Sequence, residues 1–125
     1  MRTQPLVLVI DDSHDARDLY AVALALEGFV VEGASDGQEG VRKAIELLPD
    51  LIVTDLLMPI MDGRETIRRL KADERTRRIP IIACSGDGDA ARMFETWADV
   101  LLPKPCPLDS LLVEIRSLLR RSSAA

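Results

Sequence analysis

The sequence contains 125 residues, which is enough for one hydrophobic core and too few for two of ordinary size. Hydrophobic residues make up 47% and charged residues 30%, the balance of a globular chain rather than a disordered one. The net charge of −5 argues against direct nucleic-acid binding, and no apolar stretch approaches the roughly 20 residues that a membrane helix needs. Two cysteines without a zinc or disulfide spacing indicate a reducing compartment. We therefore expect a single cytoplasmic domain over residues 1–125, with a core at about 6–121 and a tail at 122–125.

The first third of the chain predicts two strands separated by a helix. Leu6–Ile10 is a continuous apolar run, which is typical of a strand buried on both faces of a sheet. Ser13 is a good N-cap, and Gly28 stops the helix that it opens. Residues 29–32 form a second short strand, which we expect Gly33 to end.

The middle of the chain repeats this order of elements. A helix runs from Asp36 and is closed by Pro49, after which residues 51–54 form another apolar strand. Ile67 and Leu70 mark a third helix, because their spacing places them on one helical face. Repetition of strand and helix is a first indication of a parallel sheet.

The last third of the chain predicts two more strands and two more helices. Residues 80–84 form the fourth apolar strand, and a short helix follows at 90–97 before a fifth strand at 100–102. The last helix has the clearest pattern, since apolar residues recur every three or four positions over Leu108–Leu119. Arg120–Arg121 finish it, at the end where the helix dipole favours cations.

Five strand–helix repeats predict an α/β fold, a doubly wound five-stranded parallel sheet with helices on both faces and right-handed crossovers. In such sheets ligands bind outside the carboxyl ends of the strands, at a topological switch point. The polar residues at those ends are the candidate site residues: Asp11, Asp12, Asp55, Ser85 and Lys104.

These five side chains have complementary chemistry. Three crowded carboxylates repel one another unless a cation lies between them, and an all-oxygen ligand set favours Mg2+ over Zn2+. One carboxylate is then able to attack phosphorus, while the metal and the ammonium group neutralise the phosphoryl oxygens and the hydroxyl donates to one of them. The sequence therefore predicts a metal-dependent aspartyl-phosphate site.

The sequence also resembles a known family, the response-regulator receiver domains of two-component signalling, from Leu6 to about Arg120. The segments that carry the resemblance are Asp11-Asp12-Ser13 after an apolar run, Asp55-Leu56-Leu57-Met58-Pro59 with Asp62-Gly63, Ser85 after the fourth strand, and Lys104-Pro105. The resemblance implies a flavodoxin-like (βα)5 fold with strand order 2-1-3-4-5.

The resemblance also assigns a role to each site residue. Asp55 accepts a phosphoryl group from a histidine kinase or a histidine phosphotransfer protein, Ser85 follows that group, and Lys104 is its ammonium partner. The implied Mg2+ ligands are Asp11, Asp12, Asp55 and the backbone carbonyl of Leu57. The Lys104–Pro105 bond is expected to be cis, which costs only about 0.5–1 kcal/mol before proline. Such a domain catalyses only its own phosphorylation and dephosphorylation, so we do not class it as an enzyme.

In this family the fourth helix, fifth strand and fifth helix form the usual output surface, where phosphorylation switches a protein–protein contact. A homodimer formed on phosphorylation is one partner that the resemblance allows. Here Leu101 stands where the family carries Tyr or Phe, and Trp97 stands where it tends to have a small residue. The segment between Ser85 and Lys104 is also about one helical turn shorter than usual. We interpret Leu101 as a packing residue and Trp97 as a candidate substitute for the missing aromatic group, and the output partner is not predicted.

Two positions set the lifetime of the phosphoryl group in relatives, and here they are Leu57 and Asp87. A leucine side chain has no group that orients an attacking water molecule. We therefore expect slow self-dephosphorylation.

Three other features have simpler interpretations. His14 lies close to the acidic pair, but hard Mg2+ favours oxygen, so we expect a partly exposed residue in the first turn of a helix. Arg64–Arg78 contains seven basic and three acidic residues without interleaved aromatics, which indicates a solvated helix face rather than a nucleic-acid site. Cys84 and Cys106 are expected to be packing residues.

Three alternative functions remain open. The first is a degenerate receiver that binds a partner without phosphorylation, which the presence of all five site residues argues against. The second is a phosphohydrolase that uses an aspartyl phosphate, but such enzymes resemble an Asp-x-Asp pattern rather than the adjacent Asp11 and Asp12. The third is a flavin-binding fold, but an acidic loop after the first strand would repel a phosphate without a metal.

Overall fold

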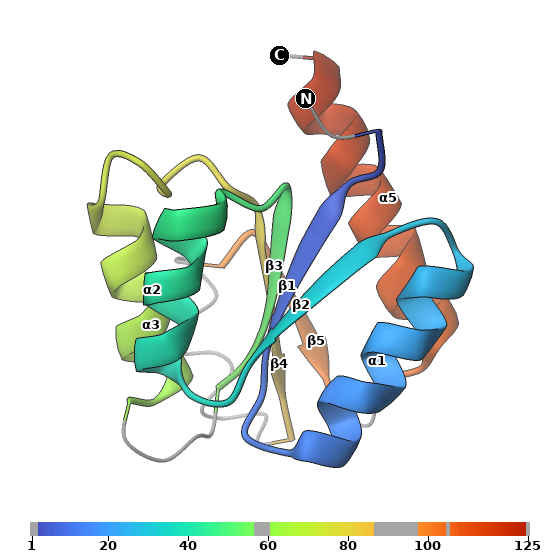
Figure 1. Ribbon diagram of the computed structural model, residues 1–125, viewed down its shortest axis with the longest axis horizontal. Coiled ribbons are helices and arrows are strands. Elements are labelled where there is room, and N and C mark those ends of the chain that lie inside the picture. Colours follow the sequence, from blue (N-terminus) through green and yellow to red (C-terminus); the bar gives the residue numbers. More distant parts are fainter. Residues whose placement is uncertain (1–2, 57–60, 87–97, 105, 125) are drawn as a thin grey trace.

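The computed structural model of the chain describes residues 3–56, 61–86, 98–104 and 106–124. Five strands form one parallel sheet in the order β2-β1-β3-β4-β5 (Figure 1). The strands are β1 (Leu6–Ile10), β2 (Val30–Ala34), β3 (Leu51–Asp55), β4 (Ile81–Ser85) and β5 (Val100–Pro103). The helices in the described ranges are α1 (His14–Leu26), α2 (Gly37–Leu47), α3 (Gly63–Ala72) and α5 (Leu108–Ala124). The predicted doubly wound fold and its strand order are confirmed.

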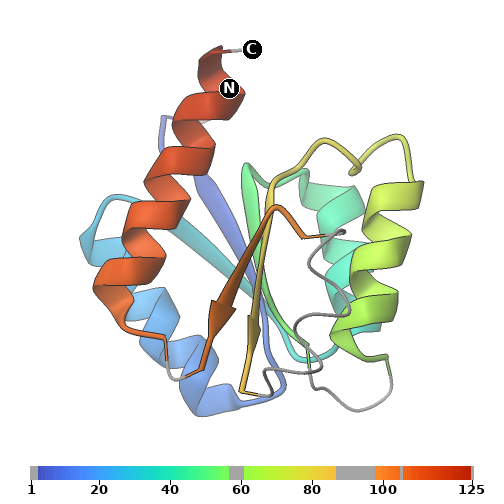
Figure 2. The same cartoon turned by 180° about the vertical axis from the view of Figure 1, so that it is seen from behind.

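Helices cover both faces of the sheet, with α1 and α5 on one face and α2 and α3 on the other (Figure 2). The side chains of β1 alternate between the two resulting cores. Val7 and Val9 lie in the core under α1 and α5, whereas Leu8 and Ile10 lie in the core under α2 and α3. All four are at most 1% exposed. A strand that is buried on both faces therefore reads as a continuous apolar run, as the sequence indicated.

Three of the helices begin at a side-chain cap. Ser13, Asp36 and Asp62 each accept a hydrogen bond from the backbone N–H three residues further on, at 3.2, 2.8 and 3.0 Å. Each bond satisfies one of the N–H groups that have no partner within the first turn of a helix. The beginnings of α1 and α2 were therefore predictable from Ser13 and Asp36.

The second strand differs from its prediction. It does not stop at Gly33 but runs two residues further than the predicted range of 29–32, to Ala34. Gly33 pairs with Val9, and Ala34 pairs with Ile10, so the ladder with β1 continues to the end of that strand. A glycine weakens a strand only modestly, and pairing with a central strand outweighs this effect.

Helix ends are set by backbone conformation at two places. Gly28 has φ +94°, in the left-handed region, and the predicted stop after α1 is confirmed. Leu48 ends α2 with φ 48°, directly before Pro49. The last helix is longer than predicted and extends to Ala124, because no glycine or proline follows Arg121 in the described part of the chain.

The short helix predicted at 90–97 lies outside the residues that the structure describes. None of the helices within the described ranges combines the length and the apolar character needed to cross a membrane.

Candidate functional site

Four of the predicted site residues meet at one edge of the sheet. Asp11 directly follows β1, Asp55 is the last residue of β3, and Ser85 is the last residue of β4. Lys104 follows β5, and its backbone N–H donates a hydrogen bond to the carbonyl of Ser85 at 2.9 Å. The connection after β1 leads to β2 on one side, and the connection after β3 leads to β4 on the other, so the carboxyl ends of β1 and β3 form the topological switch point of the sheet.

The fifth residue, Asp12, completes an acidic cluster at that edge. Carboxylate oxygens of Asp11, Asp12 and Asp55 all lie within 4.8 Å of one another. Asp11 and Asp55 are only 5% and 8% exposed, whereas Asp12 faces solvent. A hard divalent cation stabilises such a set, and the open side at Asp12 leaves space for the water ligands that Mg2+ retains. The donor set therefore fits Mg2+, and these three residues are the ones that would hold it.

Asp11 is held in place by its neighbours. Its backbone N–H donates to the carbonyl of Ala34 at 3.0 Å, and its Oδ1 accepts from the N–H of Ser13 at 2.9 Å. Burial raises the pKa of Asp11 above its ordinary value, although the Ser13 N–H and the charge of Lys104 oppose that rise. A cation at the acidic cluster would favour the ionised form of this carboxyl.

Lys104 supplies the positive charge of the site. Its Nζ lies 2.9 Å from Oδ2 of Asp55 and 3.8 Å from Oδ2 of Asp11. Burial acts to lower the pKa of Lys104, but the hydrogen bond to Asp55 and the charges of both carboxylates raise it above the ordinary value overall. The side chain is therefore an ammonium group directed at the carboxylate of Asp55.

A glycine allows the chain to turn closely around Asp55. The N–H of Gly63, the first residue of α3, donates to the carbonyl of Leu56 at 2.9 Å. A Cβ atom at Gly63 would collide with the carbonyl oxygen of Asp55 and lie 2.5 Å from the Cα of Leu56. Only glycine fits there without a shift of the backbone that carries Asp55.

Several residues singled out in the sequence are not placed. Those outside the described ranges are Leu57, Asp87, Trp97 and Pro105. The implied carbonyl ligand, the cis bond after Lys104 and the proposed substitute aromatic therefore stay predictions. Leu101 is described, and it packs beside the core under α2 and α3, as expected of a packing residue.

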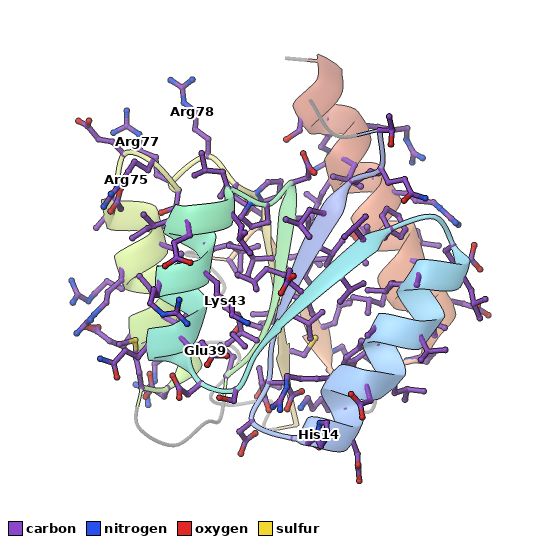
Figure 3. The ribbon with its side chains drawn as sticks, viewed as in Figure 1. His14, Glu39, Lys43, Arg75, Arg77 and Arg78 are labelled. Carbon is purple, nitrogen blue, oxygen red and sulfur yellow. The ribbon has the colours of Figure 1, made fainter. Side chains whose placement is uncertain are left out.

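His14 lies on the outside of the molecule at the start of α1 (Figure 3). Its side chain is 75% exposed, and its Nδ1 lies 3.6 Å from Oδ1 of Asp18. The predicted place of His14 in the first turn of a helix is confirmed, and its side chain is more exposed than the expected partial exposure.

Three of the seven basic residues in the segment around α3 pair with acidic residues of the same segment. Glu65 lies within salt-bridge distance of Arg68 and Arg69, and Asp73 pairs with Arg75. Figure 3 shows Arg75, Arg77 and Arg78 at the opposite end of the molecule from His14. This arrangement is that of a solvated surface, as the sequence indicated.

Both cysteines belong to the core under α1 and α5. Cys84 is buried, and burial raises the pKa of its thiol to about 12. Cys106 is partly buried and packs against the same core. Their interpretation as packing residues is confirmed.

One residue beside the site was missed in the sequence. Arg17, in the first turn of α1, donates from its Nη1 to the backbone carbonyl of Asp11 at 2.7 Å. Its position four residues after the N-cap Ser13 was an available signal, because long side chains of a helix point back toward its N-terminus.

The family model for the response regulator receiver domain matches residues 7–116. The chain belongs to the response regulator receiver family. Receiver domains of two-component systems accept a phosphoryl group and bind Mg2+ at an acidic pocket. This receiver domain has an acidic cluster, formed by Asp11, Asp12 and Asp55.

Curated relatives of this receiver domain are longer proteins. The chain is 39% identical over 121 residues to RpaA of Synechocystis sp., described as a DNA-binding dual master transcriptional regulator. This match covers 94% of the chain and 50% of that protein. The chain is also 38% identical over 117 residues to the response regulator PleD of Caulobacter vibrioides, covering 91% of the chain and 26% of that protein. It thus spans half or less of the length of these relatives.

Solved receiver domains share the whole fold. A response regulator receiver domain from Clostridium thermocellum superposes with a TM-score of 0.88 at 28% identity, covering 96% of this chain and 98% of that one. The receiver domain of a signal transduction histidine kinase from Syntrophus aciditrophicus superposes with a TM-score of 0.85 at 34% identity, covering 93% and 90%. The likeness extends over both faces of the sheet and the edge that carries the acidic cluster.

Proposed function

We propose that Asp55 of this receiver domain accepts a phosphoryl group from the phosphohistidine of a histidine kinase or a histidine phosphotransfer protein, in a Mg2+-dependent step. The observation that supports this proposal is the 2.9 Å contact between Asp55 Oδ2 and Lys104 Nζ within the acidic cluster. A nucleophile, a set of cation ligands and a fixed positive charge are thereby combined at one edge of the sheet. Each of them promotes phosphoryl transfer to a carboxylate.

In the proposed step an Asp55 carboxylate oxygen attacks phosphorus in line with its bond to the donor imidazole. The new O–P bond forms as the N–P bond breaks, and the electron pair of that bond stays on the imidazole nitrogen, which takes up a proton. The ammonium group of Lys104 neutralises charge on the phosphoryl oxygens, and the hydroxyl of Ser85 donates to one of them. These two residues stabilise the transferred group without forming a bond to it.

The proposed ligands of the cation are Asp11, Asp12, Asp55 and the backbone carbonyl of Leu57. Bound Mg2+ supplies the positive charge that allows a phosphoryl group to approach three carboxylates. Two of these residues are held in place, Asp11 by three hydrogen bonds and Asp55 as the last residue of a central strand.

The reaction ends on the protein itself, so the domain, with its core at about residues 6–121, would catalyse only its own phosphorylation and dephosphorylation. Phosphorylation would switch a protein–protein contact on the surface that includes β5 and α5, where homodimerisation is one candidate contact. The output partner is not proposed, because Leu101 departs from the family pattern on that surface.

The test is incubation with an acyl phosphate and MgCl2, followed by intact mass spectrometry. We expect one added phosphoryl group in the wild type and in Asp18→Ala, which removes an exposed carboxylate of α1, and none in Asp55→Ala. Chelation of Mg2+ should abolish the gain. Phosphorylation that persists in Asp55→Ala would reject the assigned acceptor. Continuous release of phosphate would support a phosphohydrolase, and no gain from any donor would support a degenerate receiver.

A further inference from the structure

Arg17 connects helix α1 to the peptide that joins two candidate metal ligands. Its backbone N–H donates to the carbonyl of Ser13 at 3.0 Å, in the first turn of the helix. Its Nη1 reaches back and donates to the backbone carbonyl of Asp11 at 2.7 Å. That carbonyl belongs to the peptide group between Asp11 and Asp12, so its orientation affects where both carboxylates point.

The Arg17 bond is one of three that fix Asp11. The backbone N–H of Asp11 donates to Ala34 at the end of β2, and its Oδ1 accepts from Ser13. These two bonds restrain the amide nitrogen and one carboxylate oxygen. Among the hydrogen bonds of the described residues, only the one from Arg17 restrains the carbonyl of Asp11. The other carboxylate oxygen of Asp11, Oδ2, is directed toward Lys104.

The second strand leaves space for the Arg17 side chain. Gly33 lies beside it, and a Cβ atom at that position would lie 3.2 Å from the Cδ of Arg17. A contact of that length is tighter than ordinary van der Waals packing, so a larger residue would push the arginine stem away. The glycine that we expected to end β2 instead provides the surface on which Arg17 lies.

We infer that Arg17 is a positioning residue, which fixes the peptide between Asp11 and Asp12 and thereby holds their carboxylates in the geometry that a divalent cation needs. Groups that orient metal ligands through hydrogen bonds commonly change metal affinity by about 10–100-fold when they are removed. The inference rests on the proposed function, because it assigns Arg17 to the Mg2+ site of that function.

The sign of the effect distinguishes positioning from simple electrostatics. A guanidinium group close to a cation site repels the cation, so removal of its charge alone would tighten Mg2+ binding. Loss of a positioning bond would weaken Mg2+ binding. The carboxylates would then sample several orientations, and binding would have to restrict them to one. The two explanations of Arg17 therefore predict opposite changes in affinity.

The experiment is a calorimetric titration of the full chain with MgCl2, in the absence of any phosphodonor. Arg17→Met keeps most of the apolar stem but removes the donor and the charge, and Arg17→Lys keeps a charge and a donor. Arg42→Met is the matched control, since it removes an exposed arginine of α2 that pairs with Glu46 away from the cluster. Thermal unfolding of each variant shows whether the fold is retained.

We expect Arg17→Met to weaken Mg2+ binding by about tenfold, Arg17→Lys to recover part of the loss, and Arg42→Met to bind as the wild type does. Unchanged or tighter binding in Arg17→Met would overturn the inference, and so would an equal loss in Arg42→Met. If Arg17→Met does not fold, Arg17→Lys decides, because it keeps the charge and changes the bond: Mg2+ binding weakened by less than about tenfold supports the positioning role, and binding that is unchanged or tighter than in the wild type overturns it.

The titration separates this inference from the proposed function. A wild type whose Mg2+ affinity depends on Arg17 but which takes up no phosphoryl group would support the inference and reject phosphorylation of Asp55. A wild type that binds no Mg2+ would reject both.

Discussion

The Nζ atom of Lys104 lies 2.9 Å from Oδ2 of Asp55, although 49 positions separate the two residues in the sequence. The pair is brought together because β3 and β5 run in the same direction on either side of β4 and end at the same edge. Asp55 is thus paired before any phosphoryl group arrives. The same ammonium group lies beside the place that the oxygens of a phosphoryl group on Asp55 would take.

Replacement of Lys104 by methionine should slow phosphorylation of Asp55 by about 100-fold, because a fixed donor to the phosphoryl oxygens is lost. The measurement is the initial rate of phosphoryl uptake from an acyl phosphate at saturating Mg2+, followed by intact mass. Lys71→Met is the control, since Lys71 pairs with Asp99 at the opposite end of the sheet. Equal rates in Lys104→Met and the wild type would contradict the role given to Lys104.

Replacement of Leu57 by asparagine should speed the loss of the phosphoryl group, because an amide orients an attacking water molecule and a leucine cannot. The half-life of the phosphorylated form, measured after removal of the donor, checks this prediction. Leu57→Ile keeps an apolar side chain and should leave the half-life unchanged. If Leu57→Asn loses the group no faster than the parent, position 57 does not control the lifetime.

Replacement of Gly63 by alanine should destabilise the protein by about 1–3 kcal/mol, the usual cost of forcing an extra carbon into a packed region. The added Cβ would collide with the backbone of Asp55 and Leu56. Gly86→Ala is the matched control, because the nearest atom to its Cβ would be the Cβ of Lys104, at an ordinary 3.8 Å. Urea denaturation measures both changes, and an equal effect at the two positions would show that the close approach at Gly63 is unimportant.

The two cysteines should differ in reactivity. At pH 8 the Cys84 thiol stays protonated, because burial raises its pKa to about 12, and its side chain is out of contact with solvent. Iodoacetamide should therefore modify Cys106 first in the native protein and both cysteines in urea, which peptide mass spectrometry measures. Cys106→Ser should remove the fast phase. Fast modification of Cys84 in the native protein would mean that β4 readily separates from its neighbouring strands and exposes the thiol to solvent.

The carboxyl of Glu65 should titrate far below its ordinary value of 4.5. Its hydrogen bond from Arg68, with a further one from Arg69, lowers its pKa to about 2. Because the folded-state pKa is lowered, the contribution of Glu65 to stability is present above about pH 4.5 and is lost as the pH falls toward 2. Carbon-detected NMR titration of the carboxyl should show a low midpoint, which rises toward 4.5 in Arg68→Met. A midpoint that does not move would show that Arg68 is not the cause.

The strand-end residues were predictable because their positions follow from a simple pattern. A continuous apolar run marks a buried parallel strand, and the next polar residue must lie at its carboxyl end. Asp11, Asp55 and Lys104 were located in this way, before any distance between them was known. Their convergence depends on strand direction, which the repetition of strand and helix predicts, and on strand order, which the resemblance to receiver domains implied.

Arg17 and the end of β2 could not be predicted in the same way. The bond from Arg17 to Asp11 depends on the conformation of a long side chain, and the sequence gives no direct sign of which carbonyl it reaches. Gly33 looked like a strand end because glycine often is one, but its pairing with Val9 depends on a neighbour distant in the sequence. The conformational preference of a single residue does not determine where a strand ends when pairing with a distant strand favours a different end.

The placement of β1 in the middle of the sheet has a consequence for synthesis of the chain. This strand is made first, yet it pairs on one edge with β2 and on the other with Leu51–Thr54 of β3. Until about residue 55 has left the ribosome, an apolar strand that is fully buried in the finished protein has at most one partner. Nascent chains of this protein should therefore depend on chaperones or on rapid elongation through β3, and ribosome-arrested chains shorter than that point should be the most prone to aggregate.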